Sequence, residues 1–275
     1  MRKLALLLIA SLSLLSACAS VDGQRTGDGL FSSNNDPIFL FSEDQERALG
    51  QQSAAAALKQ YKVLADSGVQ SYVSALGKRL AAKSDRANLD YQFTVVDSTE
   101  VNAFACPGGF IFVTSAILKD LKDESELSAV LGHEIGHVVR QHALKSMQRQ
   151  FIAENGLGVL AALMGGQTAT VLSQFGPLAS NLLLLRNGRE AELEADEQGL
   201  LIASRAGYDP AGMVGVQEML LKRVGASQGP FAEMMASHPP SEERIAQAQK
   251  LLPKYLGASE RGAESYRSHV LSRLK

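Results

Sequence analysis

The stretch His133-Glu134-Ile135-Gly136-His137 has the residue types and the spacing of a hydrolytic zinc site. Two histidines four residues apart lie on one helix face about one turn apart, so both imidazoles can reach a single ion. Glu134 lies beside that ion without binding it, and its carboxylate can take a proton from the bound water. A catalytic zinc ion takes three protein ligands and keeps one position open, so a third ligand is required.

Two histidine patterns close to this motif do not supply the third ligand. His142 is five residues from His137, which places it roughly 140° away around a continuous helix. The longer pattern H-E-x-x-H-x-x-G-x-x-H also fails, because Arg140 replaces its glycine and Ala143 replaces its third histidine. A carboxylate further along the chain is therefore expected.

We expect this carboxylate in the acidic, helix-forming run from 189 to 196. Glu192 and Asp196 lie one turn apart on one face of that helix. We predict that Glu192 is the third ligand and that Asp196 accepts the remaining N–H of a ligand imidazole. Glu190 and Glu194 point elsewhere and are expected to be solvated; the alternative is that the whole run is a charged helix face.

The residues around the first motif predict a buried helix. Asp123 and Glu126 have the spacing of an N-terminal capping pair. Gly132 and Gly136 are poor helix formers, so we expect another element or a substrate to pack closely against them. The apolar residues that cover much of the helix surface are Leu127, Val130, Leu131, Ile135, Val138 and Val139.

The segment before this helix predicts scaffold helices and a small sheet. Ser42 and Gln45 form a capping box that opens a first helix, expected to end near Leu64. Apolar residues with helical spacing predict a second helix over 69–80. Strands are expected over 91–96, 102–105 and 110–114, with the turn Pro107-Gly108-Gly109 between the last two.

Residues 155–188, between the two metal motifs, are apolar but interrupted by glycines and a proline. No part of this segment reaches the eighteen or so uninterrupted apolar residues that a membrane span needs. Short helices are expected over 157–164 and 178–185. They are core helices, a mobile lid or a membrane-touching surface, and the sequence leaves these three interpretations open.

The N-terminal residues predict that the protein is exported from the cytoplasm. Arg2 and Lys3 precede an apolar run, which is typical of a signal peptide over residues 1–17. Leu15-Ser16-Ala17-Cys18 matches a bacterial lipobox, with Cys18 as the acylated residue; an ordinary signal peptide is the alternative. Ala19, rather than Asp, resembles lipoproteins of the outer membrane. We therefore expect a Gram-negative protein anchored at the periplasmic face of that membrane, with residues 18–40 as anchor and flexible tether.

Length and composition limit the number of domains, the partners and the cysteine chemistry of the chain. Removal of 17 residues from 275 leaves 258, enough for one domain, expected over 41–255, and a polar tail over 256–275. Without Arg2 and Lys3, the chain has 25 basic and 29 acidic residues, so its charge predicts no nucleic-acid partner. Cys106 is then the only free thiol, and we expect it to be a packing residue.

The motifs in order resemble the HtpX-like and CaaX prenyl protease superfamily of zinc metallopeptidases, in particular its periplasmic branch. They are His133-Glu134-x-x-His137, Glu192-x-x-x-Asp196, the preceding segment 101–114 and the following Ser237-His238-Pro239. The resemblance covers about residues 41–250. It implies a mainly helical α+β, zincin-like domain with a small sheet next to the first motif. It also implies one zinc ion per chain, held by His133, His137 and Glu192, with Glu134 as the general base.

The resemblance also suggests roles for residues outside these motifs. Asn102, Ala103, Phe104 and Ala105 are expected to form the edge strand nearest the metal, where an extended peptide adds as a further strand. A plain structural hairpin is the alternative. His238 is expected to face the active site, where it bonds the oxyanion or occupies the open metal position in a latent form. Arg189 is a second candidate for the oxyanion role.

By resemblance, the function is an endopeptidase acting on misfolded or stalled envelope proteins, including outer-membrane β-barrels. The chain differs from membrane-embedded relatives in lacking transmembrane helices, and from assembly factors in lacking a helical-repeat domain. Two alternatives stay open: a non-proteolytic assembly factor or holdase with a latent or structural zinc site, and a metal-dependent esterase or amidase acting on cell-wall material. The oligomeric state does not follow from the sequence.

Overall fold

The computed structural model describes residues 41–163, 166–182, 187–223, 229, 232–255 and 257–274. The predicted signal peptide and the whole predicted anchor and tether over 18–40 lie outside these residues. So do 164 and 183–185, at the ends of the two short helices expected between the metal motifs.

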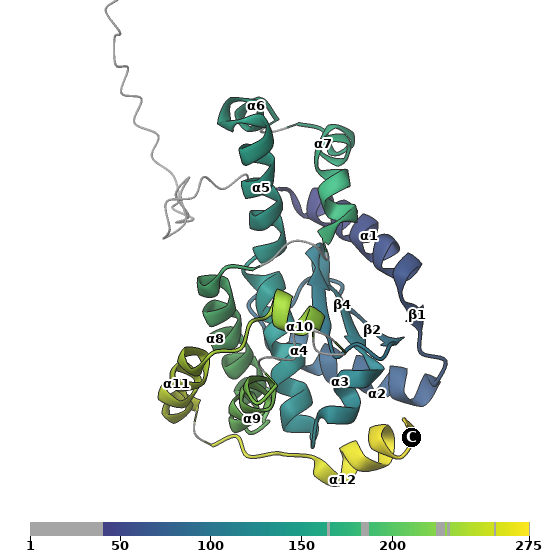
Figure 1. Cartoon of the computed structure of the whole chain (residues 1–275), viewed down its shortest axis with the longest axis vertical. Coiled ribbons are helices and arrows are strands. Elements are labelled where there is room, and N and C mark those ends of the chain that lie inside the picture. The colour runs from purple at the N-terminus through teal and green to yellow at the C-terminus, as the bar shows by residue number, and fades with distance from the viewer. Residues whose placement is uncertain are drawn as a thin grey trace, which may run out of the picture. The chain divides into compact units, whose positions relative to one another are not determined.

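A four-stranded sheet forms the frame of the domain (Figure 1). Its strands are β1 (Lys62–Val63), β2 (Gln92–Asp97), β3 (Ala103–Cys106) and β4 (Phe110–Thr114), in the order β1-β2-β4-β3. β2 and β4 are parallel, and the outer pairs are antiparallel. The three predicted strands are therefore confirmed, and β3 is an edge strand.

The sheet is buried on both faces by different helices. Side chains alternate along a strand, so Ile111 and Val113 enter one core while Phe110 and Phe112 enter the other. The first core is covered by α2 (Ser67–Ala81) and α4 (Glu124–Val139). The second is covered by α1 (Glu43–Gln60), α5 (His142–Asn155) and α7 (Thr168–Ser180). Cys106 packs in the second core, as expected for a small apolar side chain.

α1 begins with the predicted capping box, in which Ser42 and Gln45 bond each other's backbone N–H. It ends at Gln60 rather than near Leu64, because Lys62 and Val63 leave the helix to pair with Asp97 and Val96 as β1. Helix periodicity does not reveal such a short edge strand, whose hydrogen bonds are all to a distant segment.

α4 carries the first metal motif and is buried over nearly its whole length. Asp123 caps it by accepting a hydrogen bond from Glu126 N at 3.0 Å. The other half of the expected capping pair differs, since the Glu126 carboxylate accepts from Lys122 N at 2.8 Å. The helix therefore begins where the sequence predicts, with a modified cap.

Close packing of α8 (Arg189–Arg205) against α4 brings the second motif to the first. A Cβ atom on Gly132 would lie 3.1 Å from Gly199 Cα, and one on Gly136 would lie 2.9 Å from Ala195 O. Only glycines allow the two backbones to approach this closely. This confirms the close packing expected from the two glycines and identifies α8 as the partner.

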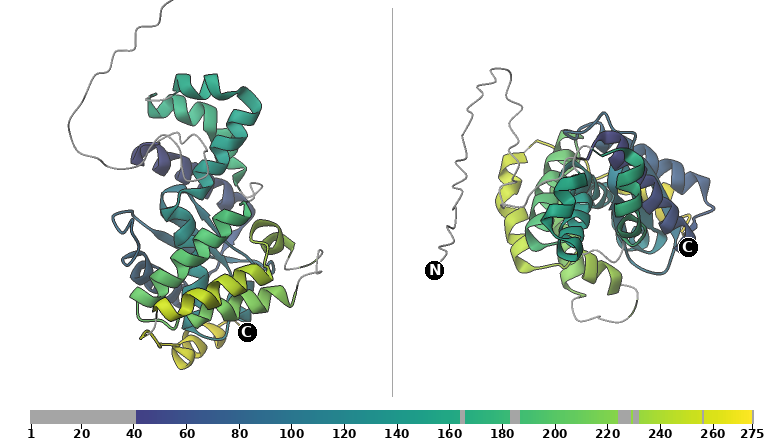
Figure 2. Two further views of the ribbon diagram at one scale, coloured as in Figure 1. Left: turned by 90° about the vertical axis from the view of Figure 1, so that its left-hand side faces the viewer. Right: turned by 90° about the horizontal axis from the view of Figure 1, so that it is seen from above.

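The remaining helices complete the domain. They are α3 (Ser115–Asp120), α6 (Leu157–Leu163), α9 (Ala211–Leu221), α10 (Ala232–Ser237), α11 (Glu242–Leu251) and α12 (Ala263–Tyr266), with short helical turns η1 (Pro107–Gly109), η3 (Leu252–Tyr255) and η4 (Arg267–Leu271). Of these, α9 and α11 pack beside the α4–α8 pair, and α6 lies at the far end of α5 (Figures 1 and 2). No helix among the described residues has both the length and the apolarity needed to cross a bilayer.

The C-terminal segment belongs to the domain, which corrects the expected boundary at 255. Tyr266 and Val270 are fully buried in the first core, and Tyr266 Oη donates to Leu118 O at 2.6 Å. Arg261 donates to the Asp123 carboxylate that caps α4, at 2.7 Å from Nη2. Most residues around Tyr266 and Val270 are polar, so the sequence shows no regular apolar pattern here and predicts a tail.

Candidate metal centre

Four buried side chains from three parts of the chain converge on one point. They are His133 and His137 of α4, Glu192 of α8 and His238 after α10, and one potential ligand atom from each lies within 4.8 Å of all the others. The two Nε2 atoms of the α4 histidines are 3.0 Å apart. Glu192 Oε1 lies 3.3 Å from His137 Nε2, and Glu192 Oε2 lies 3.2 Å from His238 Nδ1.

His133 is oriented by the carboxylate of Asp196. His133 Nδ1 lies 2.9 Å from Asp196 Oδ1, and Arg244 donates to the same carboxylate at 2.7 and 2.8 Å. Burial would raise the pKa of Asp196, but hydrogen bonds from Arg244 and His133 lower it, so the carboxylate is ionised. An ionised carboxylate only accepts hydrogen bonds, so His133 donates its Nδ1 proton to Asp196 and points Nε2 into the group, where it can bind an ion.

His137 is oriented by a second chain of contacts that the sequence did not predict. Its Nδ1 lies 2.8 Å from His142 Nδ1, and His142 Nε2 lies 3.1 Å from Glu194 Oε2. Glu194 thus pairs with a buried histidine while its side chain stays 43% exposed, so the expectation that it is solvated is only partly confirmed. The prediction that His142 is not the third ligand agrees with its absence from the converging group. The prediction that it points away from His137 is wrong.

A single backbone feature brings His142 beneath His137. Gln141 has φ 54° and ψ 34°, and it is the only non-glycine residue with positive φ in the part of the chain that the structure describes. This left-handed conformation ends α4 and starts α5 in a new direction. Gln141 Nε2 also donates to Glu46 Oε2 at 3.0 Å, which ties the turn to α1.

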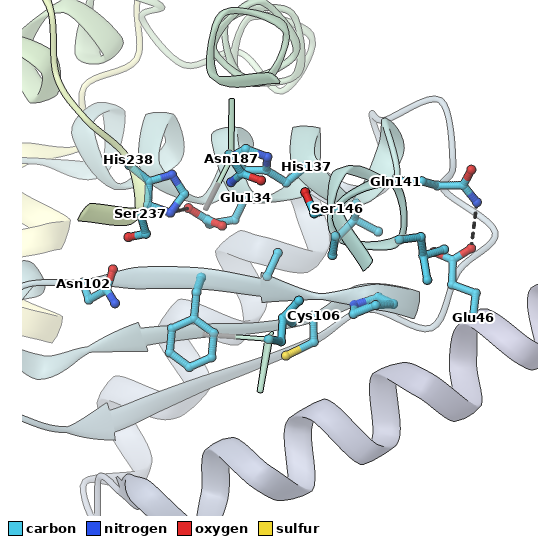
Figure 3. A pocket seen from close by; sticks show the side chains of 17 residues that line it. Glu46, Asn102, Cys106, Glu134, His137, Gln141, Ser146, Asn187, Ser237 and His238 are labelled. Carbon is cyan, nitrogen blue, oxygen red and sulfur yellow. Dashed lines mark hydrogen bonds and ion pairs between the residues drawn. The ribbon is translucent and has the colours of Figure 1, made fainter. Parts of the chain in front are cut away.

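Glu134 is buried beside the converging group. Its Oε1 lies 3.7 Å from His238 Nε2, and its Oε2 accepts no hydrogen bond from the described residues. Burial raises the pKa of this carboxyl, against the opposing effect of His238 and His133. Figure 3 shows Glu134 between His137 and His238, above the edge strand.

The cleft in front of Glu134 contains most of the predicted substrate-binding residues. Asn102, Phe104 and Ala105 line it together with Glu134 and His238 (Figure 3). Asn102 Oδ1 is buried and has no hydrogen-bond partner among the described residues. Ala103 is fully buried in the first core, so its side chain does not face the cleft.

Arg189 lies away from this group, and the structure gives no support to its expected oxyanion role. Its side chain is 73% exposed and forms an ion pair with Glu243. The cation at the centre is Arg244, which is 3% exposed and places Nη1 3.0 Å from Glu192 Oε2. Sequence patterns did not single out Arg244, although two buried carboxylates require a nearby cation and α11 is the first helix after His238.

The residues of the centre fit a zinc ion. Zinc prefers imidazole nitrogen and carboxylate oxygen, which this group supplies from His133, His137 and Glu192. Glu192 Oε1 is buried and accepts no hydrogen bond from the described residues, so it has a free lone pair for a cation. Burial would lower the pKa of His133, but Asp196 and Glu192 raise it to about 10, which shows that the surrounding charges favour a cation at this point.

His142→Ala tests the second orienting chain. Loss of this contact frees the His137 ring to rotate, so we expect zinc affinity to fall by roughly 10–100-fold. Competition with a fluorescent zinc chelator measures this affinity. His269→Ala is the matched control, because His269 is exposed and lies on η4. Equal affinity in His142→Ala and the wild type would contradict the orienting role.

Comparison with known proteins agrees with this geometry. A model of peptidase family M48 matches residues 68–252. Metalloprotease YcaL of Escherichia coli K12 is 31% identical over 250 residues, covering 88% of this chain and 94% of the relative. The β-barrel assembly-enhancing protease of Yersinia pestis is 30% identical over 216 residues, covering 76% of this chain and 44% of the relative.

A mitochondrial relative matches the same region. The metalloendopeptidase OMA1 of Schizosaccharomyces pombe is 34% identical over 188 residues, covering 66% of this chain and 53% of the relative. The chain spans less than half of the length of the β-barrel assembly-enhancing proteases that it matches. The family match covers more than half of the chain and includes α4, α8 and His238. The chain therefore belongs to peptidase family M48, in agreement with the zinc metallopeptidase motifs of its sequence.

Proposed function

We propose that this chain is a zinc-dependent endopeptidase. The observation that carries the proposal is the position of Glu134, a buried carboxylate with an unpartnered oxygen that faces both the His133–His137–Glu192 group and the cleft along β3. A purely structural zinc site closes all four positions and needs no base beside it. Casein cleavage by the full chain, compared with a Glu134→Gln variant, tests the proposal.

His133, His137 and Glu192 would hold the zinc ion. Zinc, when bound there, lowers the pKa of water and polarises the scissile carbonyl. Glu134 accepts the proton of the attacking water on its carboxylate and passes it to the leaving amine nitrogen. Asp196, held by Arg244, keeps the proton of His133 on Nδ1, and His142 with Glu194 performs the corresponding task for His137.

The substrate is proposed to bind as an extended strand along β3. Main-chain groups of an edge strand recognise a peptide through hydrogen bonds that depend little on its side chains. Asn102 Oδ1, buried and unpartnered among the described residues, offers an acceptor for a substrate N–H in the cleft that Glu134 also lines. Such recognition suits unfolded polypeptides of varied sequence.

The cellular setting is also a proposal. The lipobox at Cys18 supports an acyl anchor in the outer membrane, with the domain on the periplasmic side. Several bacterial relatives are called β-barrel assembly-enhancing proteases. These names support misfolded or stalled envelope proteins, including outer-membrane β-barrels, as substrates.

His238 is proposed to occupy the fourth ligand position in a resting form of the enzyme. Its Nδ1 lies 3.2 Å from both His133 Nε2 and Glu192 Oε2, within the converging group. His238→Ala would open that position, so we expect a severalfold rise in the rate of casein cleavage. If His238 instead stabilises the oxyanion, the same variant loses about 10²–10³-fold in kcat. Initial rates at equal zinc content distinguish the two roles.

A second candidate function follows from the same position of His238. A centre with four protein donors is closed to water, which favours a non-proteolytic assembly factor that binds unfolded clients along β3. The two functions separate in a strain that lacks the chain. Rescue of its envelope phenotype by Glu134→Gln would support the assembly factor, whereas rescue by the wild type alone would support the endopeptidase.

A further inference from the structure

α6 exposes apolar side chains at the end of a helical projection. The exposed large apolar residues among those that the structure describes are Leu58, Val63, Leu157 and Val159. Two of these four lie two residues apart on α6, where Leu157 is 55% exposed and Val159 is 44% exposed. Figures 1 and 2 show that α5 and α7 extend from the sheet and that α6 lies at their far end.

The sequence of α6 and α7 carries no charge. Residues 155–185 contain no Asp, Glu, Lys or Arg over 31 positions, between Glu154 and Arg186. At the average of 20% charged residues, a segment of this length would carry about six. A water-facing helical tip has no packing reason to exclude charge. A tip that presents apolar side chains and no charge suits contact with the boundary between headgroups and acyl chains.

The projection is a packed element that presents these side chains in a fixed place. Leu160, Val171 and Phe175 are buried between its helices, and the Phe151 and Phe175 rings stack with centroids 4.6 Å apart. Leu157 and Val159 are therefore exposed although other apolar side chains of the projection pack against one another. Their side chains point outward from a folded tip.

The start of the described chain packs against this same projection. The ring of Phe41, the first described residue, packs edge-on against Phe175 of α7 at 5.2 Å. Gln45 Nε2 donates to Gly166 O, between α6 and α7, at 2.9 Å. The described part of the chain therefore begins next to α7 and the residues that join α6 to α7.

We propose that the first turn of α6 docks end-on on a lipid bilayer, with Leu157 and Val159 on its two sides in the interfacial layer of the membrane that holds the anchor. Short apolar helices enter this layer to a depth of about 5–10 Å, and two weak membrane contacts together hold a protein more firmly than one. The contact orients the domain, since it fixes one end of the folded part of the chain against the bilayer. It does not depend on peptidase activity.

The docking also defines a substrate class, and this part rests on the proposed endopeptidase function. Leu144 and Ser146 of α5 line the catalytic cleft, and the tip lies roughly 15 Å further along the same helix. Bilayer contact would hold the cleft at that height above the lipid surface. The substrates are then polypeptide segments that lie at or emerge from the membrane surface.

A single tryptophan reports the contact, because the chain contains none. We would prepare full-length Leu157→Trp and Val159→Trp in a Glu134→Gln background and bind them to phosphatidylethanolamine–phosphatidylglycerol vesicles with brominated acyl chains. Leu58→Trp is the matched control, since Leu58 is 47% exposed on α1 and lies roughly 20 Å along that helix from its start. Flotation shows which variants are bound.

The expected result is a blue-shifted emission from Trp at 157 and 159 and strong quenching by bromine, with neither effect at 58. Bound protein whose Trp at 157 is no more quenched than Trp at 58 would overturn the docking of α6 and leave the anchor intact. Failure of all variants to float would overturn the anchor and the docking together. Tip fluorescence that shifts with protein concentration and without lipid would indicate a second copy as the occupant and also overturn the proposal.

Discussion

Glu134→Gln is expected to bind zinc as the wild type does and to cleave casein at least 10²–10⁴-fold more slowly. Glutamine has the shape of glutamate, but its amide cannot take a proton from water. Glu134 is not in the converging ligand group, so zinc content stays unchanged. Initial cleavage rates and metal analysis on the same preparations measure both quantities.

Glu218→Gln is the matched control for this variant, because Glu218 is an exposed carboxylate on α9. It should retain the wild-type rate. Full activity in Glu134→Gln would remove Glu134 from the mechanism. Loss of zinc from this variant would instead show that Glu134 is a ligand and that the assignment of Glu192 needs revision.

Arg244→Met is expected to lower the free energy of unfolding by about 3–5 kcal/mol. Arg244 is the buried cation between Asp196 and Glu192, with contacts of 2.7, 2.8 and 3.0 Å. Methionine has a similar volume but leaves two buried carboxylates without this partner. Urea denaturation of the metal-free protein measures the loss, because bound zinc would offset part of it.

Arg244→Lys separates the charge of Arg244 from its geometry, and Arg205→Met is an exposed control. Arg244→Lys keeps the charge but loses the planar fork of donors, so we expect an intermediate loss. Arg205→Met removes an exposed ion pair with Asp85 and should change stability by less than about 1 kcal/mol. Equal stability of Arg244→Met and the wild type would show that the carboxylates do not require this cation.

The parts of the centre that were predictable from the sequence are those set by local spacing. His133 and His137 are four residues apart in one helix, as are Glu192 and Asp196, so each pair shares a face whatever the tertiary structure. The glycines of α4 indicated close packing by another element or a substrate, and α8 is that element. The strands around Pro107-Gly108-Gly109 followed from turn residues and β-branched or aromatic segments.

The parts that could not be predicted depend on contacts between distant segments. Rotation around one continuous helix predicts that His142 points away from His137. Gln141 ends that helix, and the new direction of α5 brings the His142 ring into contact with His137. Glu194 points away from Glu192, yet α5 supplies a histidine on that side. Arg189 is close to Glu192 in sequence, whereas Arg244 is close in space. Helical periodicity describes one helix at a time and contains no information about its neighbours.

Removal and restoration of zinc test the central claim most directly. Full-length protein is analysed for metal, assayed on casein, stripped with a chelator, assayed again, and then reloaded with one equivalent of zinc. We predict one zinc ion per chain, loss of cleavage on stripping, recovery on reloading, and no recovery in Glu134→Gln. Casein cleavage that persists in zinc-free protein would contradict the assignment of this centre as the catalytic site.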